Sequence, residues 1–149
     1  MNLAVWVERH GRRRPDDPAV ADGDRVHANW GAFAARTIGA AAGLRGDFGL
    51  SPGNRVAIVM RNRPEYLEAL FAIWHAGLVA VPVNARLHRD EIAYILEQSQ
   101  SAVVVTDADH AGDVESLVGT VASLQAAVVA PGGRWDRLTA STPAPLVGR

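Results

Sequence analysis

Apolar and polar residues recur along the chain with two different patterns. Between Trp30 and Phe48 the apolar side chains are spaced by three and four, which predicts one long amphipathic helix with a buried face. Further along, the apolar residues form short continuous runs, as expected for strands that are covered on both faces. These runs occupy residues 56–60, 78–83, 102–106 and 126–129. The segments between them predict helices over about residues 64–76, 89–99 and 111–123.

The spacing of the predicted strands indicates how they pair. They begin about 23 residues apart, close to the shortest length that holds a strand, a return helix and two short loops. Strands joined in this way lie parallel and are connected by right-handed crossovers. The expected fold class is therefore α/β, with a mostly parallel sheet flanked by helices.

Both ends of the chain differ from this alternation. A short helix is expected near the N-terminus and ends before Pro15, and the turn at Asp22-Gly23-Asp24 predicts a small β-hairpin. After Pro131 the sequence becomes small, polar and rich in proline. We therefore expect an α/β domain over residues 1–130 and a loop or linker without a core of its own over residues 131–149.

Composition excludes several kinds of chemistry. The chain has 149 residues, 48% of them hydrophobic, which is typical of one soluble domain. It contains no cysteine, so disulfides, thiolate metal sites and a thiol nucleophile are excluded, and a reducing, cytoplasmic location is expected. All fifteen basic residues are arginine, which excludes a phosphate-loop lysine and a Schiff base. With a net charge of -1 and no long apolar run, neither nucleic-acid binding nor a membrane span is predicted.

The candidate chemical groups form no catalytic constellation in the sequence. The five histidines include no pair four residues apart on one helix, so we predict no metal site. Neither of the two glycine-rich nucleotide motifs, GxGxxG and GxxxxGK[ST], occurs. Arg61 and Arg63 lie between a predicted strand and the helix that follows it, where an anion can bind at the helix N-terminus. No catalytic residue is predicted.

Several segments together resemble one family of enzymes. Residues 15–20 read PDDPAV, residues 53–58 read GNRVAI and residues 62–66 read NRPEY. Residues 76–87, AGLVAVPVNARL, are similar to the AG-x-V-x-VP-x-N-x-RL segment of AMP-forming acyl-CoA synthetases. The resemblance runs from about Leu3 to Val129. It implies that the chain is part of the large domain of such an enzyme.

The resemblance also implies a function. Members of the family adenylate a carboxylic acid with ATP and magnesium, release pyrophosphate and pass the acyl group to coenzyme A. This chain resembles only the first part, and the phosphate loop and the adenylation lysine of the family have no counterpart in it. We expect the N-terminal fragment of an ATP-dependent ligase for fatty or aryl acids. It would be inert alone and hold no cofactor of its own, since ATP, magnesium and coenzyme A belong to the full-length enzyme.

Similarity to acetyl-CoA synthetase implies that the loop with Asn84 and Arg86 faces coenzyme A in the complete enzyme. The alternative is that the two residues only fix the loop between sheet and helix. The expected partner is the remainder of the ligase or a homologous subunit, and exposed apolar surface could also support a homo-oligomer. Two other functions stay open: a non-catalytic interaction module, or a protein that binds a nucleotide or coenzyme A through Arg61 and Arg63. Fold class alone does not decide among them.

Overall fold

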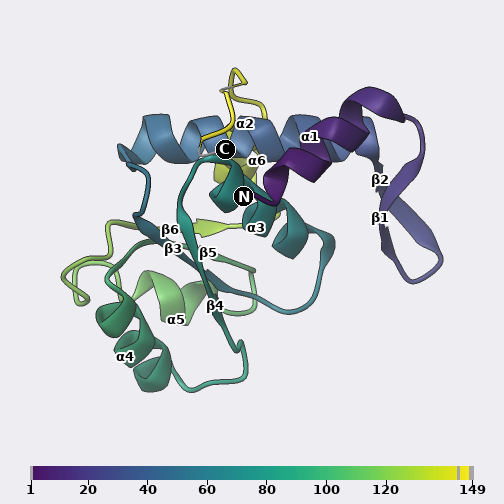
Figure 1. Ribbon diagram of the computed structural model, residues 1–149. Coiled ribbons are helices and arrows are strands. Elements are labelled where there is room, and N and C mark those ends of the chain that lie inside the picture. Colours follow the sequence, from purple (N-terminus) through teal and green to yellow (C-terminus); the bar gives the residue numbers. More distant parts are fainter. Residues whose placement is uncertain (1, 144, 148–149) are drawn as a thin grey trace.

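The computed structural model describes residues 2–143 and 145–147 (Figure 1). Its helices are α1 (Ala4–Arg13), α2 (Trp30–Phe48), α3 (Pro64–His75), α4 (Arg89–Ser99), α5 (Ala111–Glu115) and α6 (Gly133–Thr139). Its strands are β1 (Pro18–Asp22), β2 (Arg25–Asn29), β3 (Arg55–Val59), β4 (Val79–Val83), β5 (Ser101–Thr106) and β6 (Ala126–Val129). The first two strands form the expected antiparallel hairpin.

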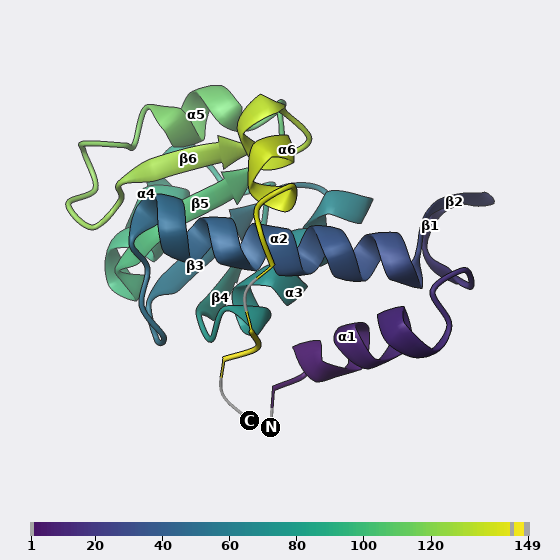
Figure 2. The same ribbon diagram turned by 90° about the horizontal axis from the view of Figure 1, so that it is seen from above.

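The other four strands form one sheet in the order β4-β3-β5-β6, and every neighbouring pair is parallel. Helices α2, α3 and α6 cover one face of this sheet, while α4 and α5 cover the other (Figures 1 and 2). Alternate side chains of the strands therefore enter two separate apolar cores, which explains their continuous apolar runs. The predicted fold class is confirmed.

The N-terminal helix and the hairpin form a smaller third cluster beside α2. Val7 of α1, Val20 of β1 and Ala28 of β2 are buried there against Phe33 and neighbouring residues. The two ends of the described chain also lie close together (Figure 2). They are joined by a hydrogen bond from the side-chain amide of Asn2 to the carbonyl oxygen of Val147 at 2.9 Å. The N-terminal segment thus contacts the rest of the domain both through Asn2 and through the cluster that α1 and the hairpin form with α2.

A buried carboxylate connects the elements on the α2 face of the sheet. Glu68 of α3 is fully buried. Its two oxygens accept hydrogen bonds from Nε and Nη2 of Arg36, on α2, at 2.7 and 3.0 Å. Trp135 Nε1 of α6 donates to the same carboxylate at 3.1 Å, and His27 Nε2 of β2 lies 3.5 Å from it. Hydrogen bonding to Glu68 raises the pKa of the Arg36 guanidinium, although partial burial acts in the opposite direction.

The prediction of a coreless loop over residues 131–149 is wrong for residues 133–139, which form α6. Trp135 and Leu138 of this helix are buried in the main core. Glycines of α2 allow the close approach: a Cβ atom at Gly39 would overlap the carbonyl oxygen of Thr139, and one at Gly43 would overlap Leu138. A helix of seven residues is too short to show a clear apolar spacing, and the contacts that stabilise this one are distant in sequence. The sequence pattern therefore did not predict it. Residues 144 and 148–149 of the predicted loop lie outside the described residues.

The predicted helix over residues 111–123 is also shorter than expected. Helix α5 ends at Glu115, and turns with hydrogen bonds to the third preceding residue follow, such as Thr120 N to Leu117 O at 3.0 Å. Gly119 has a φ of +87°, which interrupts an α-helix. Leu117 and Val121 are nevertheless buried. The apolar spacing therefore identified core positions correctly, although the backbone that presents them is not a continuous helix.

We expect opposite effects from alanine at two glycines of α2. Gly39→Ala should lower the free energy of unfolding by about 1–3 kcal/mol, because its methyl group must displace the backbone of α6. Gly46→Ala is the matched control on the same helix, since a Cβ there meets nothing within 4 Å. It should stabilise the protein by up to about 1 kcal/mol through helix propensity. Urea denaturation measures both, and a stabilising Gly39→Ala would contradict the close approach.

Candidate functional site

The strands of the parallel sheet end at the same level. Val59 at the end of β3 is paired in register with Val83 of β4 and with Thr106 of β5. The loops that follow these residues therefore meet at the carboxyl edge of the sheet. The loop after β3 leads to α3 on one face, whereas the loop after β5 leads to α5 on the opposite face. Parallel sheets form a ligand-binding crevice where neighbouring connections separate in this way.

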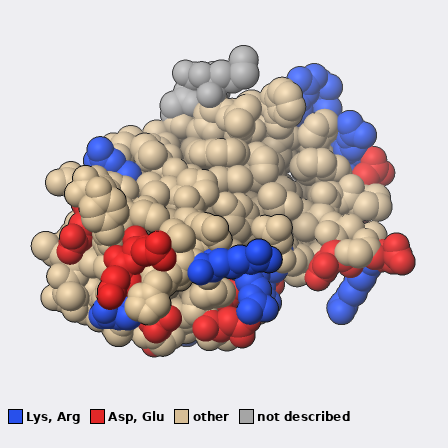
Figure 3. Space-filling view, turned by 90° about the horizontal axis from the view of Figure 1, so that it is seen from below, with Lys and Arg blue, Asp and Glu red and all other residues tan. Residues whose placement is uncertain are grey.

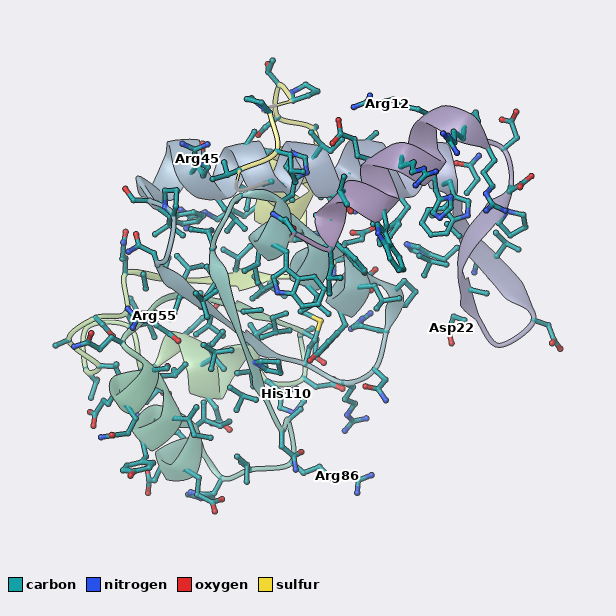
Figure 4. The ribbon with its side chains drawn as sticks, viewed as in Figure 1. Arg12, Asp22, Arg45, Arg55, Arg86 and His110 are labelled. Carbon is teal, nitrogen blue, oxygen red and sulfur yellow. The ribbon has the colours of Figure 1, made fainter. Side chains whose placement is uncertain are left out.

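An open cleft of about 1110 Å³ lies at this edge. Its lining residues come from the three loops, the end of β4 and the first turn of α3: Met60, Arg61, Asn62, Tyr66, Pro82, Val83, Asn84, Ala85, Arg86 and His110. Figure 4 shows His110 and Arg86 at this edge of the molecule, while Arg55 lies at the opposite end of β3. The volume is large enough for a nucleotide-sized ligand.

Asp107 connects two of the loops beneath the cleft. This carboxyl is almost completely buried directly after β5. One oxygen accepts a hydrogen bond from the backbone N–H of Arg61 at 2.9 Å. The other oxygen lies 3.1 Å from the backbone nitrogen of His110 and 2.5 Å from its Nδ1 atom. Asp107 thus fixes the loop after β3 and the histidine after β5 relative to each other.

The hydrogen bonds of Asp107 determine its ionisation. Burial alone raises the pKa of this carboxyl, but the hydrogen bonds from Arg61 and His110 favour the charged form more strongly. The net effect lowers the pKa of Asp107 below its ordinary value. The side chain of Arg61 extends outward, and its Nη1 atom lies 3.7 Å from a carboxylate oxygen of Asp109. Because both of these side chains are largely exposed, this ion pair is weak.

The structure brings together some of the residues proposed from the sequence. Asn84 Oδ1 accepts a hydrogen bond from the backbone N–H of Arg86 at 3.0 Å, which stabilises the local conformation of this loop. The exposed Arg86 side chain lines the cleft together with Arg61. Arg63 does not line it: its Nε donates to Glu65 at 3.0 Å, and it borders a smaller hollow of about 300 Å³ beside the hairpin.

The described part of the chain contains no cluster of typical metal ligands. Within residues 2–143 and 145–147, no three His, Cys, Asp or Glu side chains gather in a group that could hold one. The connection from β3 to α3 contains no glycine, so it does not form a phosphate loop. The residues present therefore do not fit magnesium or the triphosphate of ATP as an independent site. Arg61, Arg86 and His110 do fit an anion, because each can donate hydrogen bonds.

Charged side chains are distributed without strong separation of sign. On the face shown in Figure 3, acidic and basic side chains are interspersed along the lower edge and occur again at the upper right, and a broad central area carries no charge. The basic run Arg12-Arg13-Arg14 lies at the end of α1. Arg12 pairs with Glu8 one turn earlier, and Arg14 lies 3.9 Å from Asp17. In the part of the chain that the structure describes, none of the helices combines the length and apolar character of a membrane span.

Asp107 and His110 contribute to this site, although neither was predicted from the sequence as a site residue. His110 is not part of a histidine pair on one helix; its ring contacts an aspartate three residues before it. The sequence does contain one indication of this site. Asp107 directly follows the apolar strand that ends at Thr106, so its carboxylate is placed at the carboxyl edge of the sheet. What the sequence does not show is that the register with β3 brings the Arg61 backbone to this carboxylate.

The fold and the site define an α/β protein with its cleft at the switch point of a parallel sheet, and comparison with known proteins identifies the family. The family model for AMP-binding enzymes matches residues 7–145. The chain belongs to this family. A feruloyl-CoA synthase from an Amycolatopsis species is 37% identical over 115 residues, which are 77% of this chain and 23% of that protein. The chain therefore spans about a quarter of the length of this relative.

Solved structures agree with the fold. The benzoate CoA ligase from Burkholderia xenovorans matches 100% of this chain and 30% of its own, with a TM-score of 0.87 and 24% identity. The N-terminal domain of FACL13 from Mycobacterium tuberculosis matches 99% of this chain and 38% of its own, with a TM-score of 0.86 and 22% identity. At these identities the likeness shows the fold, which is the one found in N-terminal domains of acyl-CoA ligases.

The lowered pKa of Asp107 predicts how stability depends on pH. The folded state binds fewer protons than the unfolded state, so Asp107 stabilises the fold above the ordinary carboxyl pKa of about 4. This contribution is lost as the pH falls through the lowered pKa of the folded state. Asp107→Asn should therefore reduce the free energy of unfolding by about 1–3 kcal/mol at neutral pH, and by less as the solution becomes acidic.

Urea denaturation of both proteins over a pH series measures this difference. The matched control is Asp24→Asn in the exposed hairpin turn. Asp24→Asn should change the free energy of unfolding by no more than about 0.5 kcal/mol at every pH. A constant difference between the original protein and Asp107→Asn across the series would show that the charge of Asp107 is not what stabilises the loops.

Proposed function

We propose that this chain is the N-terminal part of an acyl-CoA ligase that activates an aryl or fatty acid with ATP and transfers it to coenzyme A. The match to the AMP-binding family over residues 7–145 is the observation that carries this proposal. The feruloyl-CoA synthase relative supports an aryl acid as one substrate class. The natural partner is the remainder of the ligase, because the chain spans only 23% of that relative.

Within that enzyme, this chain would supply the surface that faces coenzyme A. The cleft at the carboxyl edge of the sheet supports this role, since Arg86 lines it and Asn84 fixes the loop that presents Arg86. We propose Asn84 as a positioning residue and Arg86 as a contact residue. ATP and magnesium would be held by other segments of the ligase, because the residues described above do not fit them.

The isolated chain should not form an acyl-adenylate. Negative charge that develops during adenylation must be neutralised by preorganised cations. The sequence contains no lysine and no glycine-rich phosphate loop to provide them. A protein that only binds a nucleotide or coenzyme A is the second candidate, favoured by the arginine-lined cleft. A cytoplasmic location and pairing with a homologous subunit or a second copy stay predictions.

The intact mass of the protein from its native source, read with the coding sequence that follows Arg149, tests the proposal. A larger product that continues into a lysine-bearing phosphate loop is expected. That product should release pyrophosphate from ATP with ferulate, benzoate or a fatty acid, whereas the 149-residue chain alone should release none above buffer. A native product that ends at Arg149 would contradict the proposed ligase.

A further inference from the structure

An apolar hollow of about 330 Å³ lies apart from the cleft, between α1, the hairpin, α2 and α3. This hollow, the α1 groove, is lined chiefly by Trp6, Val7, Val20, Trp30, Phe33 and Phe71. None of its lining residues also lines the cleft at the carboxyl edge of the sheet. Figure 1 shows α1 and the hairpin beside α2, on the side of the molecule away from α4 and α5. The α1 groove is therefore a second, separate hollow.

The α1 groove combines a buried floor with an exposed mouth. Val7, Val20 and Phe33 are at most 4% exposed, whereas Trp6 is 58% exposed and Leu67 is 39% exposed. A membrane surface binds apolar groups that protrude into it, and it does not reach a recessed floor. A small molecule can enter such a hollow, and the volume lies at the lower end of the range for ligand pockets, about 300–1,000 Å³. The shape therefore favours a small ligand over a membrane.

The lining is rich in aromatic rings. The ring centroid of Phe33 lies 6.2 Å from that of Trp30 and 5.8 Å from that of Phe71, and both pairs meet edge to face. Trp6 adds a fourth ring at the mouth. Aromatic rings in contact gain free energy beyond that of apolar burial. A planar aromatic ring therefore suits the α1 groove better than an alkyl chain of the same size.

Positive charge adjoins the mouth of the α1 groove. A neighbouring hollow of about 370 Å³ shares Trp6 and His10 with it and is otherwise lined by Arg9, Arg13 and Arg14. Among the described residues, none forms an ion pair or a side-chain hydrogen bond with Arg9 or Arg13, and none that lines either hollow is acidic. This charge favours an anionic ligand. It disfavours a second copy docked on the same face, because like charges would then meet.

We propose that the α1 groove binds a small aromatic carboxylate, with the ring among the aromatic side chains and the carboxylate at Arg9 and Arg13. A guanidinium group can donate two parallel hydrogen bonds to one carboxylate, which fixes the orientation of the ligand. The apolar lining supplies affinity and the arginines supply selectivity for the charge. The site is separate from the cleft and does not depend on the proposed function.

Calorimetric titration of the chain with 2-naphthoate, and separately with the uncharged 2-naphthalenemethanol, tests the proposal. The two probes share a ring system and differ in charge. Replacing both Arg9→Gln and Arg13→Gln should weaken the binding of naphthoate about three- to tenfold, the effect of losing two exposed ion pairs. The same double variant should bind the alcohol unchanged. Arg55→Gln, the matched control at the far end of β3, should alter neither affinity.

Trp6→Ala tests the apolar part of the site. It should weaken the binding of both probes about fivefold or more, because an aromatic wall of the groove is lost. Tyr94→Ala is the matched control, since Tyr94 is an aromatic residue of α4 that is 63% exposed. It should change neither affinity. Thermal unfolding checks that each variant is folded, and the exposure of Trp6 limits the cost of its removal.

Three results would overturn the inference. One is equal affinity of the original protein and Trp6→Ala for naphthoate, and another is the absence of naphthoate binding at millimolar concentration. The third is binding to anionic phospholipid vesicles that requires Trp6 while naphthoate does not bind, which would assign this face to a membrane surface. An equal loss of both probes in the double arginine variant would contradict the role of charge. None of these results alters the native mass or the sequence beyond Arg149, which test the proposed function separately.

Discussion

The buried carboxylate of Glu68 is the constraint on which the rest of the molecule depends. A charge without water must be paired and fully hydrogen-bonded, or the fold loses several kcal/mol. Arg36 and Trp135 satisfy it from two other helices, and His27 approaches it from the hairpin. Helices distant in sequence are thereby held on one face of the sheet. Helix α3, which carries Glu68, begins directly after the loop that contains Arg61.

The cleft follows from the order of the strands. Parallel strands in register end at one edge, and connections that leave β3 and β5 toward opposite faces separate there. Asp107, after β5, accepts a hydrogen bond from the backbone N–H of Arg61, after β3, and so connects the two loops. The cleft is therefore an ordered surface even though it is open. Arg61, Arg86 and His110 line it as hydrogen-bond donors, and none of the described residues in the lining is acidic. Such a surface suits an anionic ligand.

Patterns of neighbouring residues predicted the helices and strands that are determined by their own sequence. The strands, the long helix and the parallel sheet followed from apolar spacing and from the distance between strands. Helix α6 did not, because it is held by contacts with residues distant in sequence: Trp135 donates to Glu68 of α3, and Leu138 and Thr139 pack against the glycines of α2. The resemblance to a ligase family identified the loop at Asn84 and Arg86. It could not identify Asp107 and His110 as a pair facing that loop, since their juxtaposition depends on sheet register.

The most direct test of this account is a map of where coenzyme A binds. Amide chemical shifts of the isotope-labelled chain, recorded during titration with coenzyme A, report each loop separately. Changes are expected to concentrate in the loops after β3, β4 and β5, at Arg61, Arg86 and His110 above all. Changes centred on α1 and the hairpin, with these three loops unaffected, would contradict the assignment of the cleft as the functional surface.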